Sequence, residues 1–309
     1  MRLLSYVLSE AGAGELGSPR LAAMLDGSIV DIAEASNGRI SPDIHAFLGA
    51  GDSALDEVRR LLDDPPTNAI HSVSEIRICA PVPRPGKIIA LARNYAAHAT
   101  EGGAEPPDRP NVFAKFTNTV TGPYDPIILP GVSEQVDYEA ELAVVLGRRC
   151  KHVPQDEALQ MVAGYTIAND VSVRDYQKMV SQFTLGKTFD THCPMGPVLL
   201  TADEVPDPQA LDLRCSIDGI VLQEGNTSEM VFGVAYMIAY LSEIMTLEPG
   251  DVILTGTPSG VGMWRNPPRW ILPGEKVRVD IPQIGYIENQ AVVEVNAGDG
   301  VTKLSTALD

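Results

Sequence analysis

The sequence has few cysteines and no long hydrophobic run, and each absence excludes a class of protein. Its 4 cysteines stand far apart, none in a C-x-x-C spacing, so reduced thiols are expected rather than a disulfide framework or a zinc site. No apolar run approaches the roughly 20 residues of a membrane-spanning helix. The N-terminal apolar stretch is short and soon meets Glu10, which does not favour a signal peptide. These absences predict a cytoplasmic protein without a membrane partner.

Basic residues are also scarce. The 23 Lys and Arg stand against 41 Asp and Glu, which gives a formal net charge of -18. The average field therefore repels phosphate backbones and anionic lipids, and nucleic acid is not expected as a partner. A small anionic substrate would meet the same repulsion, so a site for one requires local cations, either a metal ion or positioned Lys and Arg side chains.

The composition is otherwise that of a globular protein, with 44% apolar and 21% charged residues in a chain long enough for a core with a satellite domain. Residues 1–76 combine strand-like runs with an amphipathic segment at 53–62, for which Ser53 is a plausible N-cap. They predict a small N-terminal α/β module. Residues 77–309 form a second domain in this interpretation.

Short β runs separated by Pro and Gly dominate the second domain and predict a β-rich α+β fold. Asp218 and Gly219 stand between two such runs, which is the two-residue signature of a type I′ hairpin. Only two long helical segments are expected, at residues 156–162 and 228–245. The expected strands of this domain include residues 87–91, 112–116, 127–129, 139–146, 165–168 and 213–217.

Two glutamates in one of these strands form the first candidate site. Residues i and i+2 of a strand share a face, so Glu139 and Glu141 project side by side, about 7 Å apart. In a run that continues into apolar residues they would repel each other and lose hydration unless a cation lies between them. On spacing alone, two solvated glutamates on an exposed edge strand are an equally good interpretation. Asp170, after the strand-like residues 164–168, adds a third carboxylate, and three oxygen ligands without nearby Cys or His favour Mg²⁺, Mn²⁺ or Ca²⁺ over zinc.

Five short motifs occur in the order of a known family, and together they are stronger evidence for a resemblance than any one of them alone. The chain resembles the fumarylacetoacetate hydrolase family over about residues 80–295, and in particular its bacterial acylpyruvate hydrolase and 2-hydroxyhepta-2,4-diene-1,7-dioate isomerase-like members. The motifs are IIALARNYAAH at 88–98, DYEAEL at 137–142, NDVSVRD at 169–175, GKTFD at 186–190 and TGTPSGVG at 255–262.

The resemblance implies a mixed β-barrel or β-roll core, a homodimer, and a metal ion, Mg²⁺ or Mn²⁺ with Ca²⁺ as a further option, on Glu139, Glu141 and Asp170. It implies that Lys187 stabilises an enolate of a metal-chelated 2-oxo acid. The candidate substrate contacts are Arg93, Tyr95 and Thr257. The loop of Thr257 follows a strand-like run and can offer a hydroxyl to a carboxylate, although a tight turn is the plainer interpretation. Arg93 and Arg174 are cations that could face the substrate, although a surface salt bridge is the commoner role of such residues.

His98 and Glu101 are spaced i, i+3, so they would be neighbours on a helix. Without the family, an incidental pair on a surface helix is the better interpretation. The resemblance implies instead a water-activating pair on a mobile lid, with Gly102 and Gly103 as a hinge. We therefore expect His98, Glu101 and Lys187 to be the catalytic residues, with substrate-defining contacts in the lid and around residues 179–184.

Together these features predict a divalent-metal-dependent hydrolase that cleaves a carbon–carbon bond in a 2,4-dioxo acid, such as an acylpyruvate or fumarylpyruvate, through an enolate. Two alternatives stay open at this point. One is a decarboxylase or isomerase of a 2-oxo or 2-hydroxymuconate-type diacid in aromatic catabolism. The other is a non-catalytic binding protein that a metal stabilises.

Overall fold

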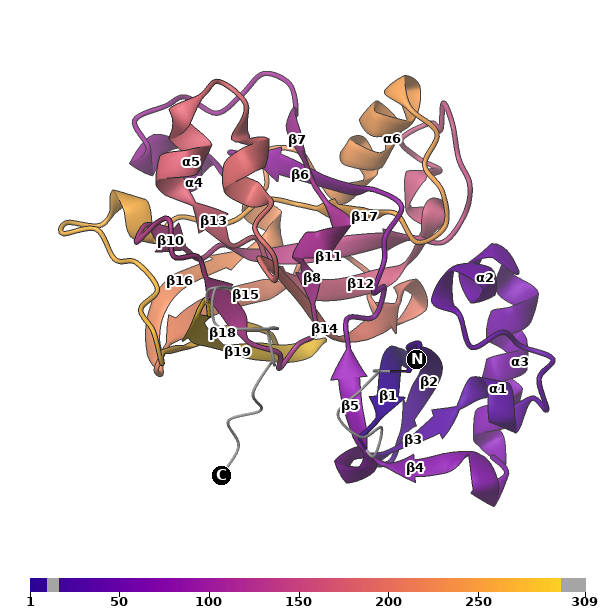
Figure 1. Ribbon diagram of the computed structural model, residues 1–309. Helices are drawn as coiled ribbons and strands as arrows, with labels where there is room; N and C mark the ends of the chain where they lie inside the picture. The colour runs from indigo at the N-terminus through magenta and orange to yellow at the C-terminus, as the bar shows by residue number, and fades with distance from the viewer. Residues whose placement is uncertain (10–16, 296–309) are drawn as a thin grey trace.

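The computed structural model describes residues 1–9 and 17–295 of the chain. The N-terminal part is an antiparallel sheet in which β1 pairs with β2, β2 with β3, and β3 with β4. Three helices cover one side of this sheet (Figure 1), and two of them also contact the rest of the molecule, because Phe47 packs in the same core as Val145 and Asp52 pairs with Arg148. The elements are β1 (Arg2–Leu8), β2 (Arg20–Leu25), β3 (Ser28–Asp31), β4 (Ile70–Ser72), β5 (Ile76–Cys79), α1 (Ile32–Ala35), α2 (Ile44–Gly49) and α3 (Asp52–Asp63).

Helix α3 follows the predicted amphipathic stripe but not the predicted cap. Val58 is fully buried, and Leu55 packs beside it against the same core. The helix begins at Asp52 after Gly51, whose φ of 71° lies in the left-handed region that favours glycine, and no side chain caps it. The prediction that Ser53 is the N-cap is therefore wrong, because the chain enters the helix at the glycine two residues earlier.

Strand β1 joins the N-terminal sheet to the main one. It pairs with β5 along one part of its length and with β14 at Arg2 and Leu3. The result is a 12-stranded sheet in the order β4-β3-β2-β1-β14-β12-β11-β17-β6-β7, with β5 and β8 as branches. The domain boundary at residue 76 stays a prediction, since hydrogen bonds run across it. The further strands are β6 (Ile88–Ala92), β7 (Asn111–Lys115), β8 (Val120–Thr121), β11 (Ala140–Leu146), β12 (Val162–Asn169), β14 (Cys193–Thr201) and β17 (Val252–Leu254).

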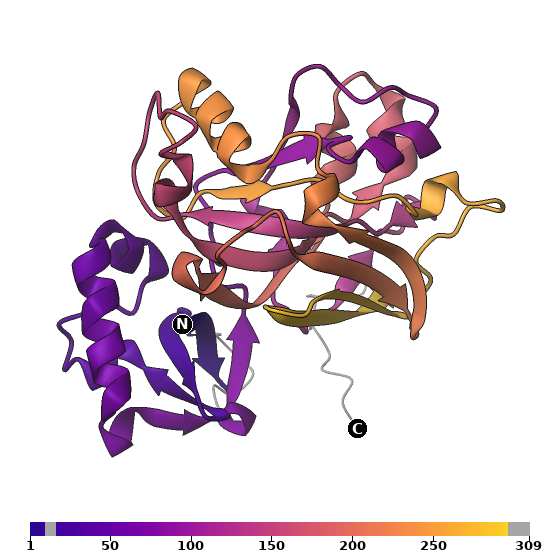
Figure 2. The same cartoon turned by 180° about the vertical axis from the view of Figure 1, so that it is seen from behind.

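A second, five-stranded sheet packs against the middle of the first, with β11, β12 and β14 on β15, β18 and β19 (Figures 1 and 2). Asp218 and Gly219 connect β15 to β16 with φ values of 47° and 80°, which confirms the predicted hairpin with two left-handed residues. The strands, in the order β16-β15-β18-β19-β9, are β9 (Ile127–Leu129), β15 (Asp212–Ile217), β16 (Ile220–Asn226), β18 (Lys276–Ile281) and β19 (Gly285–Val293). A two-stranded sheet contains β10 (Val136–Asp137) and β13 (Ser172–Val173).

Strand β11 is the centre of the hydrophobic core. All seven of its residues are buried. Leu142 and Val144 pack into the core between the two sheets, whereas Ala143 and Val145 pack into the core on the other face. Alternate side chains of a strand point to opposite faces, so a strand covered on both sides is apolar at nearly every position. Glu141 is the exception in this strand.

The β-rich α+β class is confirmed. Among residues 1–9 and 17–295 the strand order of neither large sheet closes on itself, so the core is a pair of packed sheets rather than a closed barrel. Three further helices lie above the large sheet, with α4 and α5 near one another at one end and α6 at the other (Figures 1 and 2). They are α4 (Ala96–Glu101), α5 (Arg174–Met179) and α6 (Val234–Ile244). None of the described helices is long and apolar enough to span a bilayer.

Both long helices predicted for the second domain are shorter than expected. Residues 156–162 contain only the 3₁₀ turn η4 (Ala158–Met161), because β12 begins at Val162. In residues 228–245 the helix starts at Val234. The backbone N–H groups of Val231 and Phe232 donate instead to the carbonyl and side-chain oxygens of Asn94, at 2.7 and 2.9 Å, so they do not enter a helix. The other 3₁₀ turns are η1 (Thr67–Ala69), η2 (Val73–Glu75), η3 (Thr117–Thr119), η5 (Phe183–Lys187), η6 (Ala202–Glu204), η7 (Thr227–Glu229) and η8 (Gly262–Trp264).

Candidate active site

Three carboxylates meet where β11 and β12 pair. The antiparallel register sets Ala140 opposite Asn169, so Glu139, just before β11, and Asp170, just after β12, become neighbours. The backbone N–H of Asp170 donates to the carbonyl of Glu139 at 2.9 Å. Carboxylate oxygens of Glu139, Glu141 and Asp170 lie within 4.8 Å of one another. Their exposed fractions are 5%, 1% and 0%, which excludes two solvated glutamates on an edge strand.

Two lysines, both buried, neutralise part of this cluster. Lys187 Nζ donates to Glu139 Oε2 at 2.6 Å and to Asp170 Oδ2 at 2.7 Å. Lys115, at the end of β7, donates to the other oxygen of Asp170 at 2.6 Å. Burial acts to lower the pKa of Lys187, but Asp170 and Glu139 outweigh it and hold that pKa above its ordinary value. Lys187 is therefore charged where the sequence predicts a catalytic cation.

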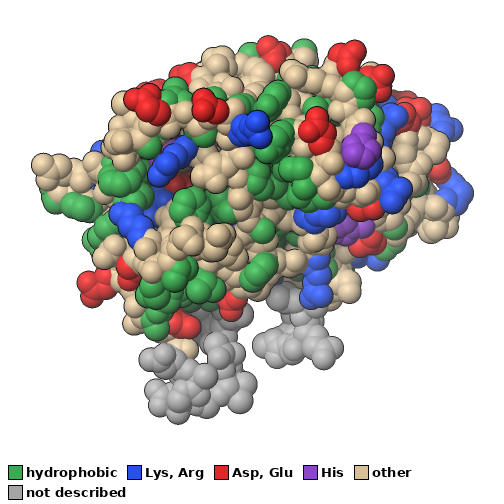
Figure 3. All heavy atoms as spheres, turned by 90° about the horizontal axis from the view of Figure 1, so that it is seen from above, with side chains coloured by type: hydrophobic (Ala, Val, Ile, Leu, Met, Phe, Trp, Pro, Cys, Tyr) green, Lys and Arg blue, Asp and Glu red, His purple; other side chains and the backbone are tan. Residues whose placement is uncertain are grey.

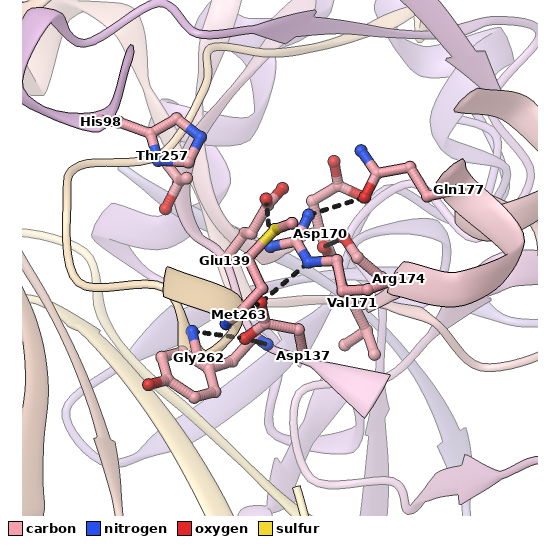
Figure 4. Close-up of polar contacts among 12 residues, drawn as sticks. His98, Asp137, Glu139, Asp170, Val171, Arg174, Gln177, Thr257, Gly262 and Met263 are labelled. Atoms are coloured by element: carbon pink, nitrogen blue, oxygen red, sulfur yellow. Dashed lines mark hydrogen bonds and ion pairs between the residues drawn. The ribbon is translucent and has the colours of Figure 1, made fainter. Parts of the chain in front are cut away.

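Arg174, the first residue of α5, connects the cluster to a further carboxylate. Its Nη2 donates to Glu139 Oε1 at 2.7 Å and its Nε to Asp137 Oδ2 at 2.8 Å. Asp137 in turn accepts hydrogen bonds from the backbone N–H groups of Gly262 and Met263, at 2.7 and 3.0 Å (Figure 4). A Cβ atom on Gly262 would meet the carbonyl oxygen of Arg269, so only glycine allows this approach. Asp137 thus links the strand of the metal-ligand candidates to the loop around η8.

The two glutamates have opposite electrostatic environments. Burial acts to raise the pKa of Glu139, but Arg174 and Lys187 outweigh it and hold that pKa well below its ordinary value. For Glu141, burial and the repulsion of Asp170 and Glu139 raise the pKa well above the ordinary value. In the described part of the chain its carboxylate accepts one hydrogen bond, from the backbone N–H of Gly256 at 2.7 Å. Glu141 is the carboxylate that would gain most from an added cation.

The buried charges fit a divalent metal ion. When all four carboxyl groups are ionised, as metal binding requires, they face three cations, which leaves an excess of one negative charge, and the ligand atoms are all oxygen. Oxygen donors suit Mg²⁺, Mn²⁺ or Ca²⁺ rather than a soft metal. A divalent ion would turn the excess into one positive charge, which favours an anionic substrate. The charged side chains counted are Asp137, Glu139, Glu141, Asp170, Lys115, Arg174 and Lys187.

His98 and Glu101, the pair predicted to activate water, contact each other in the structure. His98 and Glu101 both lie on α4, and His98 Nδ1 is 2.7 Å from Glu101 Oε1. The second oxygen of Glu101 accepts a hydrogen bond from the backbone N–H of Gly260 at 2.8 Å. With Nδ1–H donated to Glu101, the imidazole presents Nε2 as its free acceptor. Helix α4 is therefore tied, through Glu101, to the loop that also carries Thr257.

A cavity of about 310 Å³ joins these groups. Glu139, Glu141, Lys187, His98 and Thr257 all line it. Thr257 Oγ1 is held by Gln223 Nε2 at 2.8 Å, and Gln223 also accepts from the backbone N–H of Ala140 at 3.0 Å. The remaining wall residues are Leu91, Ala92, Arg93, Gly102, Phe113, Arg174, Gln177, Lys178, Val180, Ser181, Phe183, Met263 and Trp264, which include part of the region 179–184 expected to contact the substrate.

Of the predicted substrate contacts, Arg93 lies on the cavity wall, whereas Tyr95 lies in the hydrophobic core. Arg93 is exposed and lines the cavity. Tyr95 is fully buried in the core between the sheets, is not among the residues of the cavity wall, and its hydroxyl has no hydrogen-bond partner in the described part of the chain. His192, which superficially resembles part of a zinc site, is also buried, and burial lowers its pKa to about 3, which fits a structural imidazole.

Sequence reasoning did not assign Lys115 or Asp137. Lys115 ends a strand-like run without any flanking motif, and its position depends on β7 pairing with β6. Asp137 lies within the DYEAEL motif, but its role depends on contacts with Gly262 and Met263, more than 120 residues away along the chain. No local signal identifies either contact.

The β-rich α+β core places a buried carboxylate cluster, which could hold a divalent metal ion, beside a cavity large enough for a small molecule. The chain belongs to the fumarylacetoacetate hydrolase family, whose model, described as Fumarylacetoacetate (FAA) hydrolase C-terminal, matches residues 87–292. It is therefore an enzyme of a family that includes hydrolases, isomerases and tautomerases, and the non-catalytic interpretation is not supported.

Three similar proteins bear on the chemistry. The mitochondrial oxaloacetate tautomerase fahd2 of Xenopus laevis is 42% identical over 296 residues, which cover 94% of this chain and 90% of that protein. A 5-carboxymethyl-2-hydroxymuconate delta-isomerase from Mycobacterium smegmatis is 32% identical, with a TM-score of 0.73, over 95% of this chain and 100% of that one. The maleylpyruvate hydrolase from Sphingobium sp. SYK-6, solved with manganese(II) and pyruvate, is 29% identical, with a TM-score of 0.78, over 96% and 100%.

Proposed function

We propose that the protein is a divalent-metal-dependent enzyme that interconverts the keto and enol forms of a small 2-oxo diacid, with oxaloacetate as the substrate. The observation that carries the proposal is a single cavity lined by two of the three clustered carboxylates, by Lys187, and by the ring of His98. The similarity to an oxaloacetate tautomerase over 94% of the chain supports this choice of substrate.

Glu139, Glu141 and Asp170 would hold the ion, and Mg²⁺ or Mn²⁺ would supply polarisation of the 2-oxo group. His98 Nε2 takes a proton from C3 of the keto form, and the protonated ring passes this proton to the carbonyl oxygen as the enol forms, which returns His98 to its neutral state. Glu101 holds the ring in one orientation through Nδ1 and stabilises its protonated state. Lys187, charged and buried, stabilises the negative charge that develops on the oxygen.

Hydrolysis of an acylpyruvate is the second candidate. The His98 and Glu101 pair could equally deprotonate a water that attacks the distal carbonyl, as the sequence predicts. The similarity to a maleylpyruvate hydrolase solved with manganese(II) and pyruvate supports this reading. Decarboxylation of the same diacid would use the same cation and enolate. The homodimer, the cytoplasmic location and the identity of the ion stay predictions.

One assay separates these reactions. The ultraviolet absorbance of enol-oxaloacetate is followed with Mg²⁺, with Mn²⁺ and with excess chelator, while pyruvate is measured in parallel. A tautomerase accelerates the approach to the keto–enol equilibrium without releasing pyruvate, and chelator abolishes the acceleration. Pyruvate from oxaloacetate would indicate the decarboxylase instead, and pyruvate from acetylpyruvate or fumarylpyruvate the hydrolase.

The His98→Asn variant tests the proton-transfer step. The Asn amide can still donate to Glu101, but it has no basic nitrogen to face the substrate, so kcat should fall about 100-fold or more. Metal activation should be retained, because His98 is not one of the carboxylate ligands. An unchanged kcat in this variant contradicts the role of His98.

A further inference from the structure

Two cations of the cavity wall are not used by the carboxylate cluster. Arg93 and Lys178 are both exposed and both line the cavity. The ion pairs of the cavity wall are formed by Arg174 and Lys187, while His98 hydrogen-bonds to Glu101, and among the described residues no ion pair involves Arg93 or Lys178. Lys178 Nζ lies over the ring of Trp264, 4.9 Å from its centroid. The cavity therefore has an inner group of compensated cations and an outer pair of uncompensated ones.

The backbone holds Arg93 in an unfavourable conformation. Its φ is 59°, in the left-handed region that costs a non-glycine residue about 1–2 kcal/mol. The next residue, Asn94, fixes this turn. Its Nδ2 donates to the carbonyl of Thr255 at 2.8 Å and to that of Phe232 at 3.0 Å. Such strain persists where the surroundings enforce it, and it is concentrated at binding and catalytic sites.

The surroundings of the outer pair would strengthen its attraction for an anion. Phe113, Val180, Phe183 and Trp264 supply apolar wall on the same cavity. A substrate that fills the cavity would cover these walls and displace water, which lowers the effective dielectric and strengthens an ion pair. On the face seen from above, basic side chains are interspersed with acidic and hydrophobic ones, so the acidic excess does not form one continuous patch there (Figure 3). An anion that approaches this face therefore meets no continuous acidic patch that would repel it, despite the net charge of -18.

We propose that Arg93, assisted by Lys178, binds the distal carboxylate of the substrate and selects 2-oxo diacids over 2-oxo acids with an uncharged distal end. This inference rests on the proposed function, because it assumes that the 2-oxo acid end of the substrate lies at the carboxylate cluster. The inner cations are committed to Glu139 and Asp170, so the second negative charge of a diacid is left for the outer pair.

The Arg93→Gln variant tests the selection by keto–enol interconversion of two substrates. Oxaloacetate has a distal carboxylate, whereas the distal end of acetylpyruvate is an uncharged acetyl group. The ratio of their kcat/KM values, oxaloacetate over acetylpyruvate, should fall about 10- to 100-fold, the value of a charge-assisted hydrogen bond. The loss should be in KM, because the contact exists before and during the reaction. Lys178→Gln should lower the ratio less, and Arg93→Lys should restore part of it.

Arg214→Gln is the matched control, since Arg214 is an exposed arginine on β15 that does not line the cavity. It removes the same charge and should leave the ratio unchanged. A ratio in Arg93→Gln equal to that of the wild type, or an equal loss on both substrates, overturns the proposal.

A binding experiment separates this inference from the proposed function. Calorimetry with Mg²⁺ compares malate and lactate, which share a 2-hydroxy acid group but differ in the distal carboxylate. The wild type should bind malate at least about 10-fold more tightly, and Arg93→Gln should lose this preference. If no 2-oxo acid is turned over and the preference for malate holds, the proposed function fails and the anion subsite stands. If oxaloacetate is turned over and malate has no advantage, or does not bind, the subsite is overturned.

Discussion

Asp137 is the residue that joins the metal-ligand candidates to the opposite wall of the cavity. One oxygen accepts from Arg174, which also binds Glu139, and both oxygens accept from the backbone around Gly262. Asp137→Asn replaces a buried anion by an amide that cannot accept all of these hydrogen bonds, so Arg174 and Glu139 lose their fixed orientation. We expect the metal concentration for half-maximal activity to rise about 10- to 100-fold, the usual effect of removing a partner of a metal ligand.

Metal titration of the activity measures this effect, and thermal unfolding shows how much of it reflects a weaker fold. Asp280→Asn is the control, because Asp280 pairs with Arg278 outside the cavity. A variant at Asp137 that unfolds earlier but keeps the wild-type metal dependence would contradict the positioning role and leave a structural one.

At the scale of single elements, Asp31 stabilises the N-terminal part of the chain. Its buried carboxylate caps α1 and accepts from Tyr6 and Arg20, both at 2.6 Å. Burial acts to raise its pKa, but Arg20, Tyr6 and the backbone N–H of Glu34 hold the pKa below its ordinary value. A carboxyl with a lowered folded-state pKa contributes stability above its unfolded value near pH 4, and this stability is lost as the pH falls through the folded value.

Asp31→Asn should therefore lower the free energy of unfolding by about 2 kcal/mol at pH 7, because the Tyr6 hydroxyl and Arg20 lose a charged acceptor. Urea unfolding at pH 7 and at pH 3 measures the effect. The difference between variant and wild type should shrink in acid, where the wild-type carboxylate becomes protonated. Asp26→Asn, at an exposed turn position whose φ of 47° asparagine tolerates, should change neither value. A difference that persists undiminished in acid contradicts the ionic origin.

Elements with a strong local signal could be predicted, and those set by distant contacts could not. The Asp218-Gly219 hairpin and the strand of Glu141 follow from turn chemistry and side-chain periodicity, which act over a few residues. The start of α6 depends on Asn94, which lies about 140 residues earlier. The same distinction holds for the site: Glu139 and Glu141 lie two residues apart at the start of β11, so local periodicity predicts them together, whereas Lys115 and Asp137 reach the site through tertiary pairing.

At the scale of the whole molecule, the acidic excess continues into the interior. The chain carries a net charge of -18, and its buried cluster also holds more carboxylates than cations. Such an arrangement lowers stability through repulsion until a cation binds. Function and stability thus oppose one another at Glu141, which is the least compensated carboxylate of the cluster.

The Glu141→Gln variant should separate the effect of Glu141 on stability from its effect on metal binding. The amide keeps an oxygen for the N–H of Gly256 and removes the repulsion from Glu139 and Asp170, so the metal-free variant should melt at or above the temperature of the metal-free wild type. Saturating Mn²⁺ should stabilise the wild type, by about 2.7 kcal/mol at 100 times the dissociation constant, and should have little effect on the variant. Thermal unfolding with Mn²⁺ and with chelator measures both. A variant that melts lower without metal and still responds fully to Mn²⁺ would mean that Glu141 is a structural acid, and the ion would have to bind elsewhere.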